Sequence, residues 1–349
     1  MSESYKIFWF RAIFKVILDR RTSVSYGELI NNMIIDAWYM VSEYKLNLGP
    51  SDNLERLILY VQDKLKLQSN IKANDLEKAL AGFEDAEYKR MKRSLIENVP
   101  YRLQAPLLPD LKGRDWNVGN AVLSEKINQH KNLIYYFERL NSFDTVITFQ
   151  DDWCDYIFAN QAIIQGWIEY NMIAYLQRRN PNIPGIINKI YPPEKRNLNE
   201  IRKLWKLCIE ISPINEIYKN TILTTETKLS IDHYIPWSYV ANDEMWNLHP
   251  TLDTINSSKH NYLPDWDKYF KKFSFIEYNM FKTAQVYEKA RIQFEKCRKA
   301  HVNDINIASG LYDESLSEEE FCHKLGNIIR PLYESAQNMG FEVRDCIGT

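Results

Sequence analysis

The chain has 349 residues, 45% hydrophobic and 26% charged, with a formal net charge of −2. This composition provides a sizeable core for about two domains and excludes a disordered chain, and the near-neutral charge excludes nucleic-acid binding through a global basic field. The five cysteines are far apart and form no C-x-x-C pair, which excludes a zinc knuckle and a disulfide framework and fits a reducing cytoplasm.

The first elements along the chain have helical patterns. The apolar run from Ile7 to Leu18 is interrupted by Arg11 and Lys15 and is too short to span a bilayer, so we expect a buried amphipathic helix. Ser25 and Glu28 form a capping-box pattern at the start of the next helix. The chain also begins without the charged region of a signal peptide. We therefore expect a cytoplasmic protein without a membrane segment.

Helices continue to alternate with breaks up to about residue 223. Asp52 is an N-cap candidate for a helix at about 52–61, and further helices are expected at about 74–98, 153–177 and 198–211. The proline- and glycine-containing stretch 101–119 predicts a long loop. The β-branched run 145–149 predicts a strand, and the stretch 180–185 is rich in helix breakers.

The hydrophobic period changes near Thr224. Residues 228–231 alternate like a strand, and residues 246–252 form a second short apolar run. Asp253 is an N-cap candidate for a short helix that stops before Pro264. The order strand, loop, strand, helix therefore occupies about 40 residues. Long helical regions are expected at 266–299 and 318–339, where Ser317 and Glu320 form another capping-box pattern.

The same segment carries a spaced set of polar residues. Residues 232–264 read D-H-Y-I-P-W-S-Y-V-A-N-D-E-M-W-N-L-H-P-T-L-D-T-I-N-S-S-K-H-N-Y-L-P. From His233 there are fourteen positions to Asn247, nine more to Asn256, three to Lys259 and five to Pro264. The pattern resembles the HNH (ββα-metal) endonuclease family, and its spacing is similar to that of the HNH domain of CRISPR RNA-guided effector nucleases. The resemblance covers roughly a tenth of the chain.

The resemblance implies a role for each matching residue. His233 would be the general base, and a histidine that titrates near neutrality suits deprotonation of water. Asp232 and Asn256 would be metal ligands, and such oxygen ligands favour one Mg²⁺ or Mn²⁺ ion over Zn²⁺. Asn247 would hold the catalytic loop in shape by hydrogen bonds, and Lys259 would neutralise phosphate charge.

Geometry restricts how these residues can act together. Neighbours on a regular strand point to opposite faces, so Asp232 and His233 can serve one phosphate only if the strand ends or bends there. In a helix, Asn256, Lys259 and His260 share one face. His260 is therefore a candidate second phosphate contact, with simple surface solvation as the alternative.

Two basic clusters are candidates for phosphate binding. The run 89–93 follows the acidic residues of 84–87, so intrahelical ion pairs explain it equally well. The second cluster, residues 282–299, closely follows the nuclease-like element and is the better candidate for binding a nucleic-acid backbone. Its candidate residues are Lys289, Arg291, Lys296, Arg298 and Lys299.

The predicted architecture is mainly α with a small ββα-metal (HNH) element, α+β overall. We assign residues 1–223 to a helical recognition or regulatory region. Residues 224–265 form the HNH element, and residues 266–349 form C-terminal helices that pack on it. Whether the helical parts form one domain or two stays open.

The resemblance implies a metal-dependent endonuclease that hydrolyses duplex DNA. A stand-alone nuclease with a large helical region resembles a restriction or phage-defence enzyme, which suggests a partner protein of a defence system. One centre cuts one strand at a time, so double-strand cleavage would need two visits or a dimer, and we favour a homodimer. The alternatives are an RNase, a structure-specific nickase, or a non-catalytic nucleic-acid-binding or interaction protein with a vestigial HNH fold.

Overall fold

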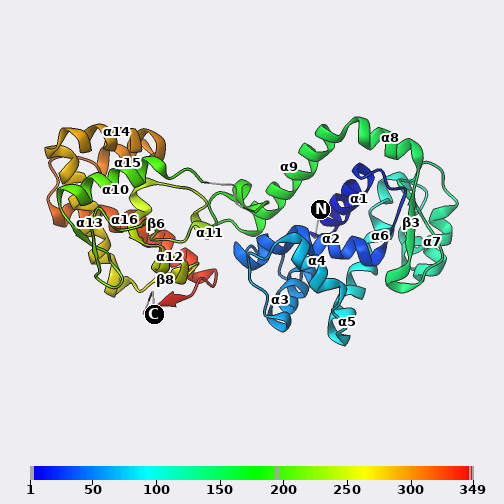
Figure 1. Ribbon diagram of the computed structural model, residues 1–349. Coiled ribbons are helices and arrows are strands. Elements are labelled where there is room, and N and C mark those ends of the chain that lie inside the picture. Colours follow the sequence, from blue (N-terminus) through cyan, green and yellow to red (C-terminus); the bar gives the residue numbers. More distant parts are fainter. Residues whose placement is uncertain (1–3, 193–195, 346, 348–349) are drawn as a thin grey trace. The chain divides into compact units, whose positions relative to one another are not determined.

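The computed structural model describes residues 4–192, 196–345 and 347. The described residues form two compact units (Figure 1). Unit 1 holds residues up to 181 together with 186–192, and unit 2 holds 182–185 and the rest of the chain. Helix α10 (Asn199–Ile211), which we had assigned to the 1–223 region, therefore folds with the nuclease-like element.

Unit 1 is mainly helical. Its helices are α1 (Tyr5–Leu18), α2 (Tyr26–Trp38), α3 (Asn53–Leu65), α4 (Ala73–Ala81), α5 (Ala86–Ile96), α6 (Val99–Arg102), α7 (Asn120–Asn128), α8 (Asp151–Ala159) and α9 (Gln161–Arg179). Strands β1 (Ser23–Ser25), β3 (Val146–Phe149) and β2 (Tyr135–Phe137) form an antiparallel sheet in that order. The strand expected at 145–149 is therefore confirmed as the central strand of this sheet.

The expected caps begin two of these helices. The Ser25 hydroxyl accepts a hydrogen bond from Glu28 N at 3.2 Å, and the Asp52 carboxylate accepts from the first turn of α3. The expected single helix at 74–98 is two helices, because the chain turns between α4 and α5. The expected helix at 153–177 is likewise divided at Asn160, whose backbone leaves the helical range (φ −109°, ψ 21°).

Unit 2 contains the helices that follow α9 and, among the described residues, three short strand pairs. The helices after α10 are α11 (Trp237–Val240), α12 (Asp253–Lys259), α13 (Trp266–Val286), α14 (Glu288–His301), α15 (Ile305–Gly310) and α16 (Glu318–Asn338). The strands are β4 (Ile214–Asn215), β5 (Ile222–Leu223), β6 (Leu229–His233), β7 (Leu248–Leu252), β8 (Leu263–Pro264) and β9 (Val343–Arg344). Pairs β4–β5 and β6–β7 are antiparallel, and β8–β9 is parallel.

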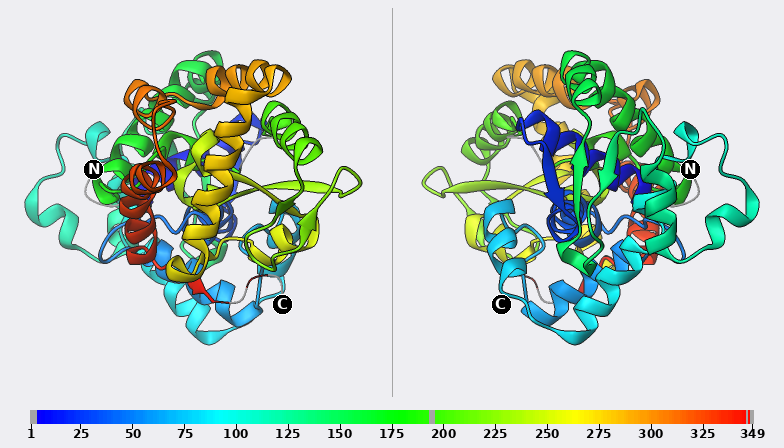
Figure 2. Two further views of the ribbon diagram at one scale, coloured as in Figure 1. Left: turned by 90° about the vertical axis from the view of Figure 1, so that its left-hand side faces the viewer. Right: turned by 90° about the vertical axis from the view of Figure 1, so that its right-hand side faces the viewer.

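The β6–β7 hairpin, followed directly by α12, is supported by the long helices of unit 2. Helix α13 packs against α16, α14 and α10, and the left view of Figure 2 shows α13 running between α16 and α10. Trp205 on α10 is fully buried, and its indole donates to Leu248 O on β7 at 3.0 Å. Each fully buried large apolar side chain contributes roughly 1.5–3 kcal/mol, so this helical shell is what stabilises a hairpin of only two strands.

The C-terminal helices partly match the expectation. Ser317 and Glu320 form the complete capping box at the start of α16. The helical region expected at 266–299 is two helices, because Tyr287 between them is extended (φ −106°, ψ 119°). The mainly α class with small β elements is confirmed. No helix in the described ranges is both long and apolar enough to cross a membrane.

Candidate active site

Strand β6 ends at the Asp-His pair. In the β6–β7 register Asp232 lies opposite His249, and His233 lies opposite Leu248. The two side chains start on opposite faces because the strand is regular up to this point. The strand stops at His233, as the sequence required for both residues to reach one phosphate. Both residues are almost completely buried, with 4% and 5% of their surface exposed.

The fully buried Asn247 fixes the chain that follows the strand. Its Oδ1 accepts from Ile235 N at 2.8 Å, and its Nδ2 donates to Ile235 O at 3.0 Å. Its backbone oxygen also accepts from Tyr234 N at 2.9 Å. Three hydrogen bonds thus hold the segment after His233 against the start of β7, which is the kind of loop-holding contact expected of this residue.

Asp232 is surrounded by hydrogen-bond donors. Tyr218 donates its hydroxyl to Oδ2 at 2.8 Å, and His249 Nε2 lies 3.3 Å from the same oxygen. Lys259 Nζ lies 3.1 Å from Oδ1. Burial alone would raise the pKa of Asp232, but the Lys259 charge and the His249 and Tyr218 hydrogen bonds outweigh it and hold the pKa well below its ordinary value. The carboxylate is therefore ionised at neutral pH.

The environment of Asp232 and Asn256 fits a hard divalent cation. A carboxylate has about four lone-pair positions, and the three donors around Asp232 leave one open. Asn256 on α12 donates its Nδ2 to Ser230 Oγ at 2.8 Å and to Ile231 O at 3.3 Å. Its amide oxygen accepts no hydrogen bond from the residues that the structure describes. One carboxylate and one amide oxygen suit Mg²⁺, which retains several waters.

No larger ligand set competes with this pair. Among the described residues, no group of three or more His, Cys, Asp and Glu side chains could hold a metal ion.

His233 is oriented by a carboxylate that the sequence did not single out. Its Nε2 lies 2.9 Å from Asp243 Oδ1, so the ring donates there and its Nδ1 keeps the lone pair. Arg196 NH1 lies 3.4 Å from that Nδ1. Burial lowers the pKa of His233 and outweighs the opposing effect of Asp243, so the imidazole is neutral at pH 7. A neutral ring whose Nδ1 keeps its lone pair, with Arg196 NH1 at the long distance of 3.4 Å, can accept a proton.

The loop that carries Asp243 is anchored at the end of α14. His301 Nδ1 donates to the Asp243 backbone oxygen at 2.9 Å. Asn303 Nδ2 donates to the neighbouring Glu244 carboxylate at 2.5 Å. Hydrogen bonding by His233 holds the pKa of Asp243 below its ordinary value, although burial opposes this. The position of Asp243, the partner of His233, thus depends on residues at and just after the end of α14, which lie about 50 positions beyond β7 in the sequence.

Lys259 and His260 differ from their expected arrangement. Lys259 is 1% exposed, and its ammonium donates to Asp232 and, at 2.5 Å, to His233 O. Helix α12 ends at Lys259, and His260 beyond it is exposed with φ +46°. The expectation that Asn256, Lys259 and His260 share one helix face is therefore wrong for His260, because the helix ends one residue before it. The side chains of Asn256 and Lys259 both hydrogen-bond to β6.

The basic candidates lie on α14. Four of them line a cavity of about 690 Å³ together with apolar residues of α13: Arg291, Lys296, Arg298 and Lys299. Lys289 is exposed outside that cavity. Arg298 is bound by Glu295 at 2.7 Å. The same helix also carries His301, whose ring anchors the Asp243 loop.

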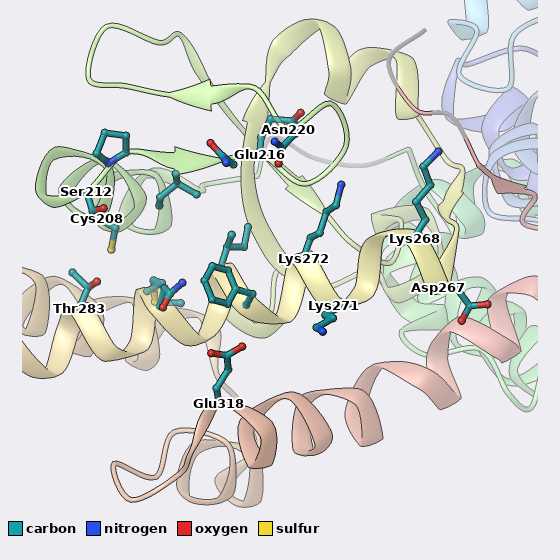
Figure 3. Close-up of a pocket in the computed structure, with 17 residues that line it drawn as sticks. Cys208, Ser212, Glu216, Asn220, Asp267, Lys268, Lys271, Lys272, Thr283 and Glu318 are labelled. Carbon is teal, nitrogen blue, oxygen red and sulfur yellow. The ribbon is translucent and has the colours of Figure 1, made fainter.

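A second cavity of about 790 Å³ lies between α13 and the segment that precedes β6 (Figure 3). Lys272 on α13 points across it toward Asn220, and Glu216 borders it from the same side as Asn220. The Glu216 carboxylate is used internally, accepting from Tyr218 N at 2.9 Å. Neither Asp232 nor His233 lines this cavity, so it is separate from the candidate site.

Four contributors to the site were not identified from the sequence. They are Arg196, Tyr218, Asp243 and His249, and all four contact Asp232 or His233. His249 lies opposite Asp232 in the β6–β7 register. The sequence would have indicated this pair if the position of the hairpin turn had been known. Nothing in the spacing indicates the other three, because Arg196 and Tyr218 precede the motif and Asp243 lies in an irregular loop.

Comparison with known proteins gives one match. Residues 215–265 match a family model described as HNH endonuclease. The match includes Tyr218 and the β4–β5 hairpin, and so it begins nine residues before the expected boundary at 224. Arg196 and the α14 residues lie outside it. No curated protein and no solved structure matches the chain.

Proposed function

Residues 215–265 form an HNH-family domain, and from this premise we propose that the protein is a metal-dependent endonuclease that hydrolyses DNA phosphodiester bonds. The observation that carries the proposal is the junction at the end of β6. There the ionised Asp232 is followed directly by the neutral His233, which Asp243 orients by a hydrogen bond. Asn256 of α12 hydrogen-bonds to Ile231 of the same strand, β6.

His233 acts as the general base. Its Nδ1 removes a proton from the attacking water, while Nε2–H remains bonded to Asp243, whose negative charge stabilises the imidazolium that forms. Asp232 and Asn256 hold a divalent ion, Mg²⁺ or Mn²⁺, which when bound offsets charge on the phosphoryl and leaving oxygens. Attack on the phosphorus from the His233 side leaves 5′-phosphate and 3′-hydroxyl ends.

Lys259 and Asn247 act through other residues. The Lys259 ammonium links Asp232 Oδ1 to the His233 backbone oxygen, so it fixes the carboxylate relative to the base. We propose this positioning role in addition to compensation of phosphate charge. Asn247 keeps the segment after His233 in place.

The α14 surface supports DNA as the substrate. Its five basic residues, Lys289, Arg291, Lys296, Arg298 and Lys299, exceed the two acidic residues of the same helix, and backbone binding depends on such cations. His260 is an exposed candidate contact at the end of α12. We further propose that unit 1 recognises DNA, a partner protein or a trigger in restriction or phage defence, and that a homodimer makes double-strand cuts.

The function is tested by incubating the protein with plasmid, linear duplex, single-stranded DNA and RNA in the presence of Mg²⁺ or Mn²⁺. We expect nicking and then linearisation of plasmid, and loss of both when EDTA removes the ion. Preferential cleavage of RNA would replace the DNA proposal with an RNase. Failure to cleave any of the four substrates with either ion would contradict nuclease activity.

Asp243→Asn is expected to reduce the cleavage rate about tenfold, less than the 10²–10⁴-fold contribution of a general base, because the base itself remains. The Asp243 charge raises the pKa of His233 against the effect of burial. Its removal should lower that pKa further and shift the acidic limb of the pH dependence of kcat/KM to lower pH. The measurement is a pH–rate profile of both proteins, and Asp313→Asn, at an exposed turn far along the chain, is the control. An unshifted acidic limb would mean that Asp243 does not act on His233.

A further inference from the structure

A hollow of about 400 Å³ opens at the beginning of α10, outside the segment that matches the HNH family. Its lining residues come from one short stretch of chain: Arg196, Asn197, Leu198, Asn199 and Arg202. Two of the five carry guanidinium groups. The hollow therefore offers a concentrated positive charge in a chain whose net charge is −2.

Arg196 connects the hollow to the candidate base. Its NH1 lies 3.4 Å from His233 Nδ1 and 3.5 Å from Asp243 Oδ1. A guanidinium has five N–H donors, and within the described part of the chain only NH1 makes hydrogen bonds. The group lies over the Trp237 ring, 5.1 Å from its centre, and the side chain is 36% exposed. The remaining donors are free to bind a ligand.

Arg202 connects the hollow to α12. Its guanidinium makes no hydrogen bond or ion pair with the residues that the structure describes. Together with the hydrogen bond from Lys228, its charge lowers the pKa of Asp253 at the start of α12. Helix α12 carries Asn256, the candidate metal ligand. Arg196 of the hollow thus contacts His233, and the charge of Arg202 acts on the first residue of the helix that carries Asn256.

The acidic groups near the hollow already have cationic partners. Asp243 is paired with Arg196 and hydrogen-bonded to the neutral His233 ring, and Asp253 is paired with Lys228 at 2.5 Å. Their charges are therefore largely compensated, and they do not exclude an anion from the two arginines. The planar, bidentate guanidinium matches phosphate in particular.

We propose that this hollow binds a phosphate group of the substrate strand next to the phosphate that is cleaved. The proposal rests on the proposed nuclease function. The cleaved phosphate must lie between His233 Nδ1 and the Asp232–Asn256 pair. A neighbouring phosphate on the Arg196 side then reaches the free donors of Arg196 and Arg202. Backbone contacts of this kind fix the register of the strand without reading its sequence.

The test compares a substrate that has neighbouring phosphates with one that has none. The proteins are wild type, Arg196→Ala, Arg202→Ala and Arg196→Lys, and the control is Lys203→Ala. Lys203 is a cation of the same helix that pairs with Glu200 outside the hollow. The substrates are a duplex oligonucleotide and bis(p-nitrophenyl) phosphate, a single diester.

We expect each arginine-to-alanine change to lower kcat/KM for the duplex about tenfold or more, since one charge-assisted hydrogen bond accounts for such a factor. The loss on the small diester should be several times smaller. Arg196→Lys should recover part of the loss because it keeps the charge without the bidentate geometry. Lys203→Ala should behave as wild type on both substrates.

Binding gives a second readout that does not require cleavage. In a His233→Ala background, the slope of log K against log salt for duplex binding should decrease by about one for each lost phosphate contact. Equal losses on both substrates would overturn the proposal, because the arginines would then act on the cleaved phosphate or on the base. An unchanged salt slope would also overturn it. If the wild type cleaves neither the duplex nor the small diester, the nuclease function itself would instead be contradicted.

Discussion

His233→Ala should lower the rate of DNA cleavage by about 10²–10⁴-fold, the contribution of a positioned general base. At the end of β6, His233 is neutral, and its Nδ1 keeps a lone pair that meets Arg196 NH1 at the long distance of 3.4 Å. The substitution removes that proton acceptor but leaves Asp232 and Asn256, so binding of the metal ion should persist. The measurement is single-turnover cleavage of a duplex with saturating Mg²⁺.

The control for this variant is His323→Ala, at an exposed histidine of α16. It should cleave at the wild-type rate. Circular dichroism and a melting curve will show whether His233→Ala is folded, since the lost ring is buried. A folded His233→Ala protein that keeps more than a tenth of the wild-type rate would exclude His233 as the base.

Asp232→Asn should abolish metal-dependent cleavage and also lower the free energy of unfolding by about 3–5 kcal/mol, the usual cost of removing one member of a buried ion pair. The substitution leaves the Lys259 ammonium, 1% exposed, without an anionic partner. The neutral amide would also present an N–H toward the Tyr218 hydroxyl or the Lys259 ammonium, which both donate in the native protein. Denaturant unfolding with EDTA present measures the stability effect free of metal binding.

A double variant separates the two effects. Asp232→Asn combined with Lys259→Met removes both charges and should recover much of the lost stability, while cleavage stays absent. Asp253→Asn, in an exposed pair with Lys228, should leave stability nearly unchanged. A double variant as unstable as Asp232→Asn alone would show that the pair is not what stabilises this centre.

The same residue predicts a pH dependence of stability. The pKa of Asp232 is lower in the folded state than in the unfolded chain, so its contribution is complete above the unfolded pKa of about 3.9. It is lost as the pH falls through the folded pKa. The difference in the free energy of unfolding between wild type and Asp232→Asn should therefore narrow below about pH 4, and a constant difference would contradict the buried ion pair.

The helices were predicted well where a local signal marks their ends. Ser25, Asp52 and Ser317 cap α2, α3 and α16 as expected, because a cap depends on residues within one turn. The breaks at Asn160 and Tyr287 were missed, because neither position has the glycine or proline that interrupts a hydrophobic period. A continuous apolar pattern cannot distinguish one long helix from two that pack against the same core.

From the sequence alone we could predict the residues of the candidate centre: the Asp-His pair at a strand end, and Asn247 and Asn256 at family spacing. These features are readable because a strand, a turn and a helix place residues at fixed intervals. Only the tertiary structure decided the partners of that pair. Asp243 binds His233, Tyr218 binds Asp232, and Arg196 reaches the base from 37 positions upstream. Hydrogen bonds are short-range, so which donors and acceptors meet depends on how helices and loops far apart in the sequence pack, and residue spacing does not record that packing.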